Sequence, residues 1–173
     1  MSEQQEPVVE RLEAQRYVAV RGEVTENSFR SFIDQNFSRP FEWLGSQGKA
    51  PAGPPLIRYL SLDNGGNPRL MDLGVPVAEP VEPDEDFIAG ELPAGEYLTY
   101  LHVGPFQHEN LTDLRDAVER MLAWAEENGV ELDRTETDEG PEFGASAEYY
   151  LVDPSTEPDF TKWQTRIVML TAG

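Results

Sequence analysis

Glu148 is the residue of this sequence whose type and surroundings point most directly to chemistry. It lies in the run Ser146-Ala147-Glu148-Tyr149-Tyr150, and alternate residues of a β-strand share a face, so Glu148 and Tyr150 face the same way. A carboxylate beside a tyrosine on a half-buried sheet is costly unless a cation or hydrogen bonds compensate its charge. Such a group can hold a cationic ligand, or it can accept a proton from water as a general base.

Two other interpretations of Glu148 require no ligand. The side chain can lie on a solvated face, or it can pair with Arg58 or Arg166, in a chain that has 33 acidic and 13 basic residues. The sequence leaves both interpretations open beside the functional one.

The chain contains an internal repeat, which indicates where Glu148 lies in the fold. In both copies a glycine follows a tryptophan by five residues, Gly48 after Trp43 and Gly129 after Trp124. A glycine at this distance from an apolar helical segment is typical of a helix stop. The two copies therefore predict equivalent helices in two similar halves.

After each helix comes a short β-like run that contains tyrosine. Aligning Tyr59 with Tyr150 places Glu148 opposite Ile57. Two similar halves predict a pseudo-twofold arrangement with a cleft between them. An acid that is present in only one half is then the natural candidate for a binding determinant.

Each half is predicted to follow the order strand, strand, helix, strand, strand. Hydrophobic periodicity and turn residues predict strands over residues 8–12, 16–24, 56–62, 71–77, 88–92, 95–103, 142–152 and 163–170. Helices are expected after Phe29, with a break or fresh start at Pro40, and over 111–125. The order predicts an α+β fold with duplicated β-α-β-β units, an antiparallel sheet, two helices on one face and a groove between them.

The expected organisation is a single domain over residues 1–173, with the repeat covering about 8–78 and 87–171. The acidic runs Asp84-Glu85-Asp86 and 136–139 are predicted to be solvated loops.

Composition excludes several classes of protein. The chain has no cysteine, which excludes thiolate catalysis and disulfides, and it begins with no basic, apolar leader. A net charge of −20 repels phosphate backbones and anionic lipid, so neither nucleic acid nor membrane is expected as a direct partner. Abundant acid with only two lysines suggests a cytoplasmic protein of a halophilic host, because salt screens such self-repulsion.

Three segments together resemble the GyrI-like effector-binding domain. They are the run His102-Val103-Gly104-Pro105-Phe106, the Trp124 to Gly129 spacing, and Glu148-Tyr149-Tyr150-Leu151-Val152-Asp153-Pro154. The resemblance covers about Val8 to Leu170. It implies a stand-alone relative of the drug-sensing domains of multidrug-responsive transcription activators and of gyrase-modulating proteins.

In that family the residue corresponding to Glu148 is on the floor of a pocket for cationic, lipophilic compounds. The family usually has tyrosine after Gly-Pro, where this chain has Phe106, which keeps the aromatic surface and lacks the hydroxyl.

Aromatic residues near strand ends could form the walls of such a pocket. Each of them could equally fill the core beneath the helices. Besides Glu148, the candidate ligand-binding residues are Tyr59, Tyr100, Phe106, Tyr150, Trp43 and Trp163.

No metal site and no cofactor are predicted, since His102 and His108 lie six residues apart without a convincing third ligand.

Three functions remain open at this stage. The first is binding of a lipophilic or cationic small molecule with Glu148 as charge partner. The second is hydrolysis of reactive, cyclopropane-containing toxins, with Glu148 acting on water and Tyr100 or Tyr150 as the acid. The third is an interaction role, in which the acidic surface binds DNA gyrase or a transcription regulator.

Overall fold

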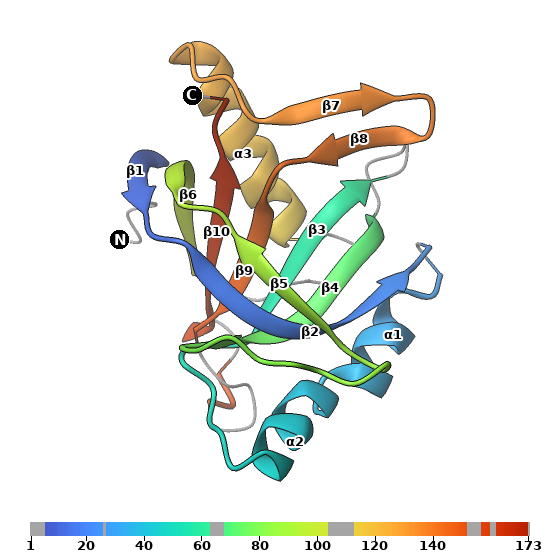
Figure 1. The fold of residues 1–173 in the computed structure, drawn as a ribbon. Coiled ribbons are helices and arrows are strands. Elements are labelled where there is room, and N and C mark those ends of the chain that lie inside the picture. The colour runs from blue at the N-terminus through green and yellow to red at the C-terminus, as the bar shows by residue number, and fades with distance from the viewer. Residues whose placement is uncertain are drawn as a thin grey trace.

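The computed structural model describes residues 6–25, 27–62, 68–103, 113–151, 157–159 and 162–172, which form one sheet and three helices (Figure 1). The helices are α1 (Phe29–Asn36), α2 (Arg39–Ser46) and α3 (Asp113–Glu127). The strands are β1 (Val8–Leu12), β2 (Gln15–Glu23), β3 (Leu56–Leu62), β4 (Pro68–Val77), β5 (Ile88–Leu92), β6 (Gly95–Val103), β7 (Arg134–Thr137), β8 (Gly140–Phe143), β9 (Ser146–Tyr150) and β10 (Gln164–Leu170).

The order of the strands confirms the predicted duplication. Eight of them run β1-β6-β10-β9-β3-β4-β2-β5 across the sheet, and all pairs are antiparallel. Exchanging β1 with β5, β2 with β6, β3 with β9 and β4 with β10 gives the same order read in the opposite direction, so every strand keeps equivalent neighbours. The pseudo-twofold axis therefore passes between β3 and β9, where Ile57 pairs with Glu148.

Register aligns one row of side chains across the six inner strands of the sheet through this central pair. Reading from β2 to β6, the row is Val20, Leu73, Ile57, Glu148, Ile167 and Tyr100. Tyr59 and Tyr150 each follow a member of the central pair by two residues, so they occupy equivalent positions, as the repeat predicts.

The two glycines of the repeat end their helices in the same way. Gly48 has φ of 71° and Gly129 has φ of 70°, the left-handed conformation that glycine adopts without a Cβ penalty. In both cases the next residue donates its backbone N–H to a carbonyl five residues earlier, Lys49 to Leu44 at 2.9 Å and Val130 to Ala125 at 2.8 Å. The spacing seen in the sequence thus marks a shared helix stop.

The helices cover one face of the sheet. In the first half the expected break occurs before Pro40, which lies in the first turn of α2. Together α1 and α2 pack on the side chains of β2, β3 and β4, whereas α3 packs on β6 and β10. Glu148 lies between the part of the sheet that α1 and α2 cover and the part that α3 covers.

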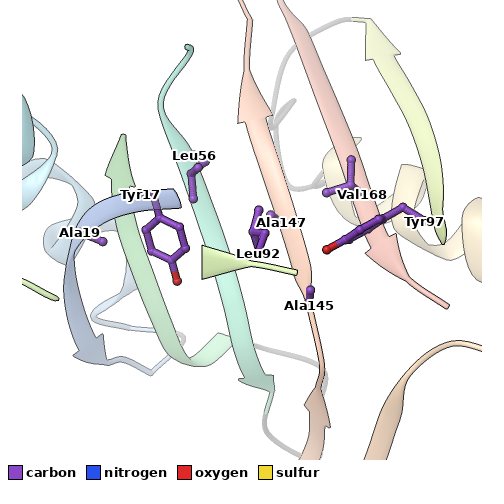
Figure 2. Close-up of a cluster of buried hydrophobic side chains, with 8 residues drawn as sticks. All are labelled: Tyr17, Ala19, Leu56, Leu92, Tyr97, Ala145, Ala147 and Val168. Carbon is purple, nitrogen blue, oxygen red and sulfur yellow. The ribbon is translucent and has the colours of Figure 1, made fainter. Parts of the chain in front are cut away.

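The opposite face of the sheet carries a second core. The sheet curls, and β2 and β5 cross in front of the other strands in Figure 1. Side chains from both ends of the sheet meet there in one buried cluster (Figure 2), which consists of Tyr17, Ala19, Leu56, Leu92, Tyr97, Ala145, Ala147 and Val168.

The expected solvated loop over 136–139 is confirmed only in part, because Glu136, Asp138 and Glu139 are exposed but residues 136–137 belong to β7. Residues 134–143 form the hairpin of β7 and β8, and its turn is closed by Thr137, whose hydroxyl donates to the carbonyl of Gly140 at 2.6 Å. The predicted strand over 142–152 is also divided, because the chain leaves β8 at Gly144 before β9 begins. A Cβ at Gly144 would lie 2.1 Å from the Asp133 carboxylate, so a larger residue here would require the Asp133 side chain to move.

None of the helices in the described part of the chain is long and apolar enough to cross a membrane.

The register of α3 can be tested with Val118, which packs half-buried against the cluster that contains Tyr100 and Met121. Val118→Asp is expected to lower the free energy of unfolding by about 1–2 kcal/mol, because a carboxylate would be partly removed from water. Urea titration measures this loss. Arg120→Ala, on the exposed side of the same helix, is the control and should change stability by less than about 0.5 kcal/mol.

Candidate functional site

Glu148 is buried on the helix-covered face, with 6% of its surface exposed. Its Oε2 atom accepts two hydrogen bonds, from the Tyr150 hydroxyl at 2.8 Å and from the Tyr59 hydroxyl at 3.1 Å. The two donors are the equivalent tyrosines of the repeat, so both halves of the protein contribute one hydroxyl to a single carboxylate. Among the described residues, no hydrogen bond reaches the other oxygen, Oε1.

Neither arginine that could have neutralised Glu148 does so. Arg58 extends from the opposite face and donates to the carbonyl of Gly144 at 2.9 Å. Arg166 pairs with Glu10 at 2.7 Å. Within the described residues Glu148 forms no ion pair with arginine, lysine or histidine. The interpretations of Glu148 as a solvated acid or as a partner of these arginines are therefore wrong.

Burial dominates the electrostatics of the site. It raises the pKa of Glu148 above its ordinary value of 4.5, and the hydrogen bonds from Tyr150 and Tyr59 oppose this rise in pKa. Burial, together with the nearby carboxylate, also raises the pKa of Tyr59 and of Tyr150 well above 10.0. Both phenols therefore remain protonated and act as donors.

Apolar side chains of α1 lie over this part of the sheet. Phe29, Phe32 and Ile33 pack in the same cluster as Tyr59 and Tyr150. Gly22 and Phe32 illustrate how closely the helix approaches, because a Cβ on the glycine would lie 2.4 Å from the phenylalanine ring. The sequence predicts a helix after Phe29, but it contains no signal that this helix lies over Glu148.

The other predicted aromatic residues lie in different surroundings. Trp43 packs in the α2 cluster, where its ring centroid is 5.7 Å from that of Phe87. Tyr100 lies under α3 and is separated from Glu148 by Ile167 in the central row. The indole N–H of Trp163 donates to the backbone carbonyl of Glu157 at 2.9 Å.

Phe106 lies outside the residues that the structure describes, and so does His108. Across the described ranges, no three His, Asp or Glu side chains form a group that could hold a metal ion.

Two cavities lie away from Glu148. One, of about 480 Å³, is between the end of α3 and β7, and its lining includes Leu122, Val130 and Arg134. The other, of about 230 Å³, is beside β2 and β5 and is lined in part by Tyr17 and Val81. Glu148 lines neither of these two cavities.

Comparison with known families identifies the one to which this chain belongs. The GyrI-like small-molecule binding domain matches residues 5–170. The chain belongs to this family. No curated protein sequence matches it.

Several solved structures share the fold of this GyrI-like domain at low sequence identity. The C-terminal domain of EcmrR is 18% identical with a TM-score of 0.65, and the match covers 96% of each chain. EcmrR bound to DNA in a transcription complex gives a TM-score of 0.70 at 18% identity, and here 96% of this chain matches 57% of that longer chain.

Two further structures carry descriptions of function. One is a hydrolase from Listeria innocua, with a TM-score of 0.61, 14% identity and coverage of 99% of this chain and 94% of that one. The other is SAV2435 bound to tetraphenylphosphonium, with a TM-score of 0.61, 12% identity and coverage of 98% and 95%.

Proposed function

We propose that this protein binds a lipophilic organic cation on the helix-covered face of the sheet, with Glu148 as the charge partner. Tyr59 and Tyr150 hold the carboxylate in place through its Oε2 atom, and Oε1 faces the ligand. The aromatic side chains of α1 form part of the wall. Membership of a small-molecule binding family supports this proposal at the level of the family.

The observation that carries the proposal is a buried acid that forms no ion pair with any residue in the described part of the chain. A carboxylate removed from water is costly unless it is paired, and two phenolic hydrogen bonds compensate it only in part. The fold itself does not require this acid, because the equivalent position in the first half holds Ile57, which is 2% exposed. A cationic ligand would supply the missing charge.

The ligand of one structural neighbour has this chemistry. Tetraphenylphosphonium, bound to SAV2435, is a delocalised cation surrounded by aryl rings. Such a cation is attracted both to a carboxylate and to the faces of tyrosine and phenylalanine rings. At 12% identity the neighbour shows only that the fold is shared, so we infer the same ligand class for this chain from Glu148 and its aromatic neighbours.

Binding requires the side chains over Glu148 to move, because only 6% of its surface is exposed. Phe29 and Phe32 are only partly buried on a short helix, and parting them from Tyr59 would open the site from the α1 side. We therefore expect ligand association well below the diffusion limit, as is usual when binding includes a conformational change.

The proposal is tested with methyltriphenylphosphonium and triphenylphosphine oxide, which have nearly the same shape and differ in charge. Calorimetry should show that the cation binds. Its affinity should increase as the pH rises through the raised pKa of Glu148 and should be constant at higher pH. The reason is that the cation favours the ionised carboxylate and lowers its pKa in the complex, so binding at low pH must release a proton. The neutral oxide should lack this dependence. Equal affinity for both compounds at every pH would contradict the proposal.

A second function is favoured by the hydrogen bond of 2.8 Å between Tyr150 and Glu148. A carboxylate and a phenol in contact could act as base and acid in the hydrolysis of a strained electrophile. Tyr150 is better placed for this role than Tyr100, which lies two strands away. Turnover of a cyclopropane-containing electrophile that is lost in Glu148→Gln would favour this function, whereas binding without consumption would favour the first.

A further inference from the structure

Thr165 is a second buried polar group for which the fold has no evident use. It lies on β10 and is 0% exposed, and its hydroxyl has no hydrogen-bond partner in the part of the chain that the structure describes. Register places it beside Tyr150 on β9, on the same face as Glu148. A buried hydroxyl without a partner is destabilising, because it gives up its hydrogen bonds to water and gains none in return.

The first half shows that the fold can close without this hydroxyl. Tyr59 pairs with Met71, whereas its equivalent Tyr150 pairs with Thr165. Thr165 therefore takes the place of Met71, which is also 0% exposed. As with Glu148 in place of Ile57, a polar residue stands in the second half where an apolar one fills the first. Both departures fall on one face, on neighbouring strands.

We propose that Thr165 determines ligand specificity by hydrogen-bonding a polar substituent of the organic cation held by Glu148. This inference rests on the proposed function. Within the strip formed by Glu148, Tyr150 and Thr165, the Tyr150 hydroxyl already donates to the carboxylate, so the threonine hydroxyl is the group available to the ligand.

The spacing of the strip defines the ligand class more narrowly. Thr165 lies two residues from Ile167, the cross-strand partner of Glu148, which makes it a diagonal neighbour of the acid. Diagonal neighbours on antiparallel strands lie roughly 7–8 Å apart. The ligand is thus an aromatic cation that carries a hydroxyl, amide or amine about one ring away from its charge, rather than a purely hydrocarbon cation.

The test compares tetraphenylphosphonium with (4-hydroxyphenyl)triphenylphosphonium, which have the same charge and differ by one hydroxyl. The wild-type protein should bind the hydroxylated probe about threefold to tenfold more tightly, the range expected for one net hydrogen bond. Thr165→Val should abolish this preference and leave the affinity for tetraphenylphosphonium unchanged. Thr165→Ser, which keeps the hydroxyl, should retain the preference.

A ligand-free measurement separates this role from a structural one. Valine has nearly the shape of threonine, so Thr165→Val should leave the melting midpoint unchanged or raise it, because it removes a hydroxyl that lacks a partner. Thr99→Val is the matched control. Thr99 is also buried, but on the opposite face, and its hydroxyl donates to Glu10 Oε2 at 2.8 Å. This control should lower the midpoint and leave the affinities for both probes unchanged.

Each result decides the inference. If the wild type binds tetraphenylphosphonium without preferring the hydroxylated probe, or if Thr165→Val keeps the preference, the inference is wrong and the proposed function stands. A Thr165→Val midpoint well below that of the wild type would show that the hydroxyl already serves the fold, which also overturns it. If the wild type binds neither phosphonium, the proposed function itself fails.

Discussion

Glu148→Gln is expected to weaken the binding of methyltriphenylphosphonium by about 10-fold to 100-fold while the affinity for triphenylphosphine oxide changes little. The substitution keeps the volume of the side chain and removes its charge. A charge-assisted contact in a sheltered site contributes about 1–3 kcal/mol, which corresponds to this loss for the cation alone. Calorimetry on both proteins with both compounds measures the difference directly.

The same substitution should not harm the fold. The amide oxygen of the introduced glutamine can still accept hydrogen bonds from Tyr59 and Tyr150. Because Glu148 forms no ion pair within the described residues, removing its charge leaves no described cation unpaired. Burial raises the pKa of Glu148 because it disfavours the ionised form, so this residue lowers stability as the pH rises through that pKa. The melting midpoint of the variant should therefore equal or exceed that of the wild type near neutral pH.

Glu10→Gln is the control for long-range charge. It lowers the net negative charge by the same amount, but it acts on the opposite face, where Glu10 pairs with Arg166. If both variants weaken cation binding equally, the effect comes from the overall field of the protein and not from Glu148. If Glu148→Gln weakens both compounds alike, the residue shapes the site without recognising charge.

The repeat is the feature of the fold that the sequence predicts best. The positions of Gly48 and Gly129 depend on local chemistry, since each ends a helix through its own left-handed backbone. The alignment of Tyr59 with Tyr150 then predicts the centre of the sheet correctly, because a twofold relation pairs equivalent strands. The β7–β8 hairpin was missed because Glu136 and Glu139 hide its alternation within a charged segment.

The candidate site could be predicted only in part. Glu148 stands out because an acid and a tyrosine share one face of a strand. That Tyr59 donates to the same oxygen depends on register between strands 89 residues apart in sequence, which local patterns do not specify. The rotation of a helix is equally non-local, so Trp43 could not be distinguished from Phe32 as a neighbour of the site before the packing of α1 and α2 was known.

The largest expected loss of stability lies on the other face, at the buried carboxylate of Asp72, which is 0% exposed. Its Oδ1 accepts from Arg21 Nε at 2.7 Å, and its Oδ2 accepts from Arg21 Nη2 at 3.0 Å and from the Tyr17 hydroxyl at 2.5 Å. Arg58 also donates to that hydroxyl, at 3.2 Å. Unlike Glu148, this acid has both its oxygens satisfied and a cation beside it.

Asp72→Ala is therefore expected to lower the free energy of unfolding by about 2–4 kcal/mol. The change leaves the buried Tyr17 hydroxyl without its acceptor and removes the bidentate partner of Arg21. Because the Arg21 side chain is 42% exposed, water can solvate its charge and the loss is smaller than for a fully buried pair. Urea titration measures the loss, with Arg16→Ala as the control on β2, the strand that carries Tyr17 and Arg21. Arg16 and Glu91 form an exposed pair at 3.7 Å, which contributes less than about 1 kcal/mol.

Similar losses in the two variants would mean that the Asp72 cluster stabilises β2 no more than a surface ion pair does. A large loss in Asp72→Ala, beside none in Glu148→Gln, would show that of these two buried acids only one is needed by the fold.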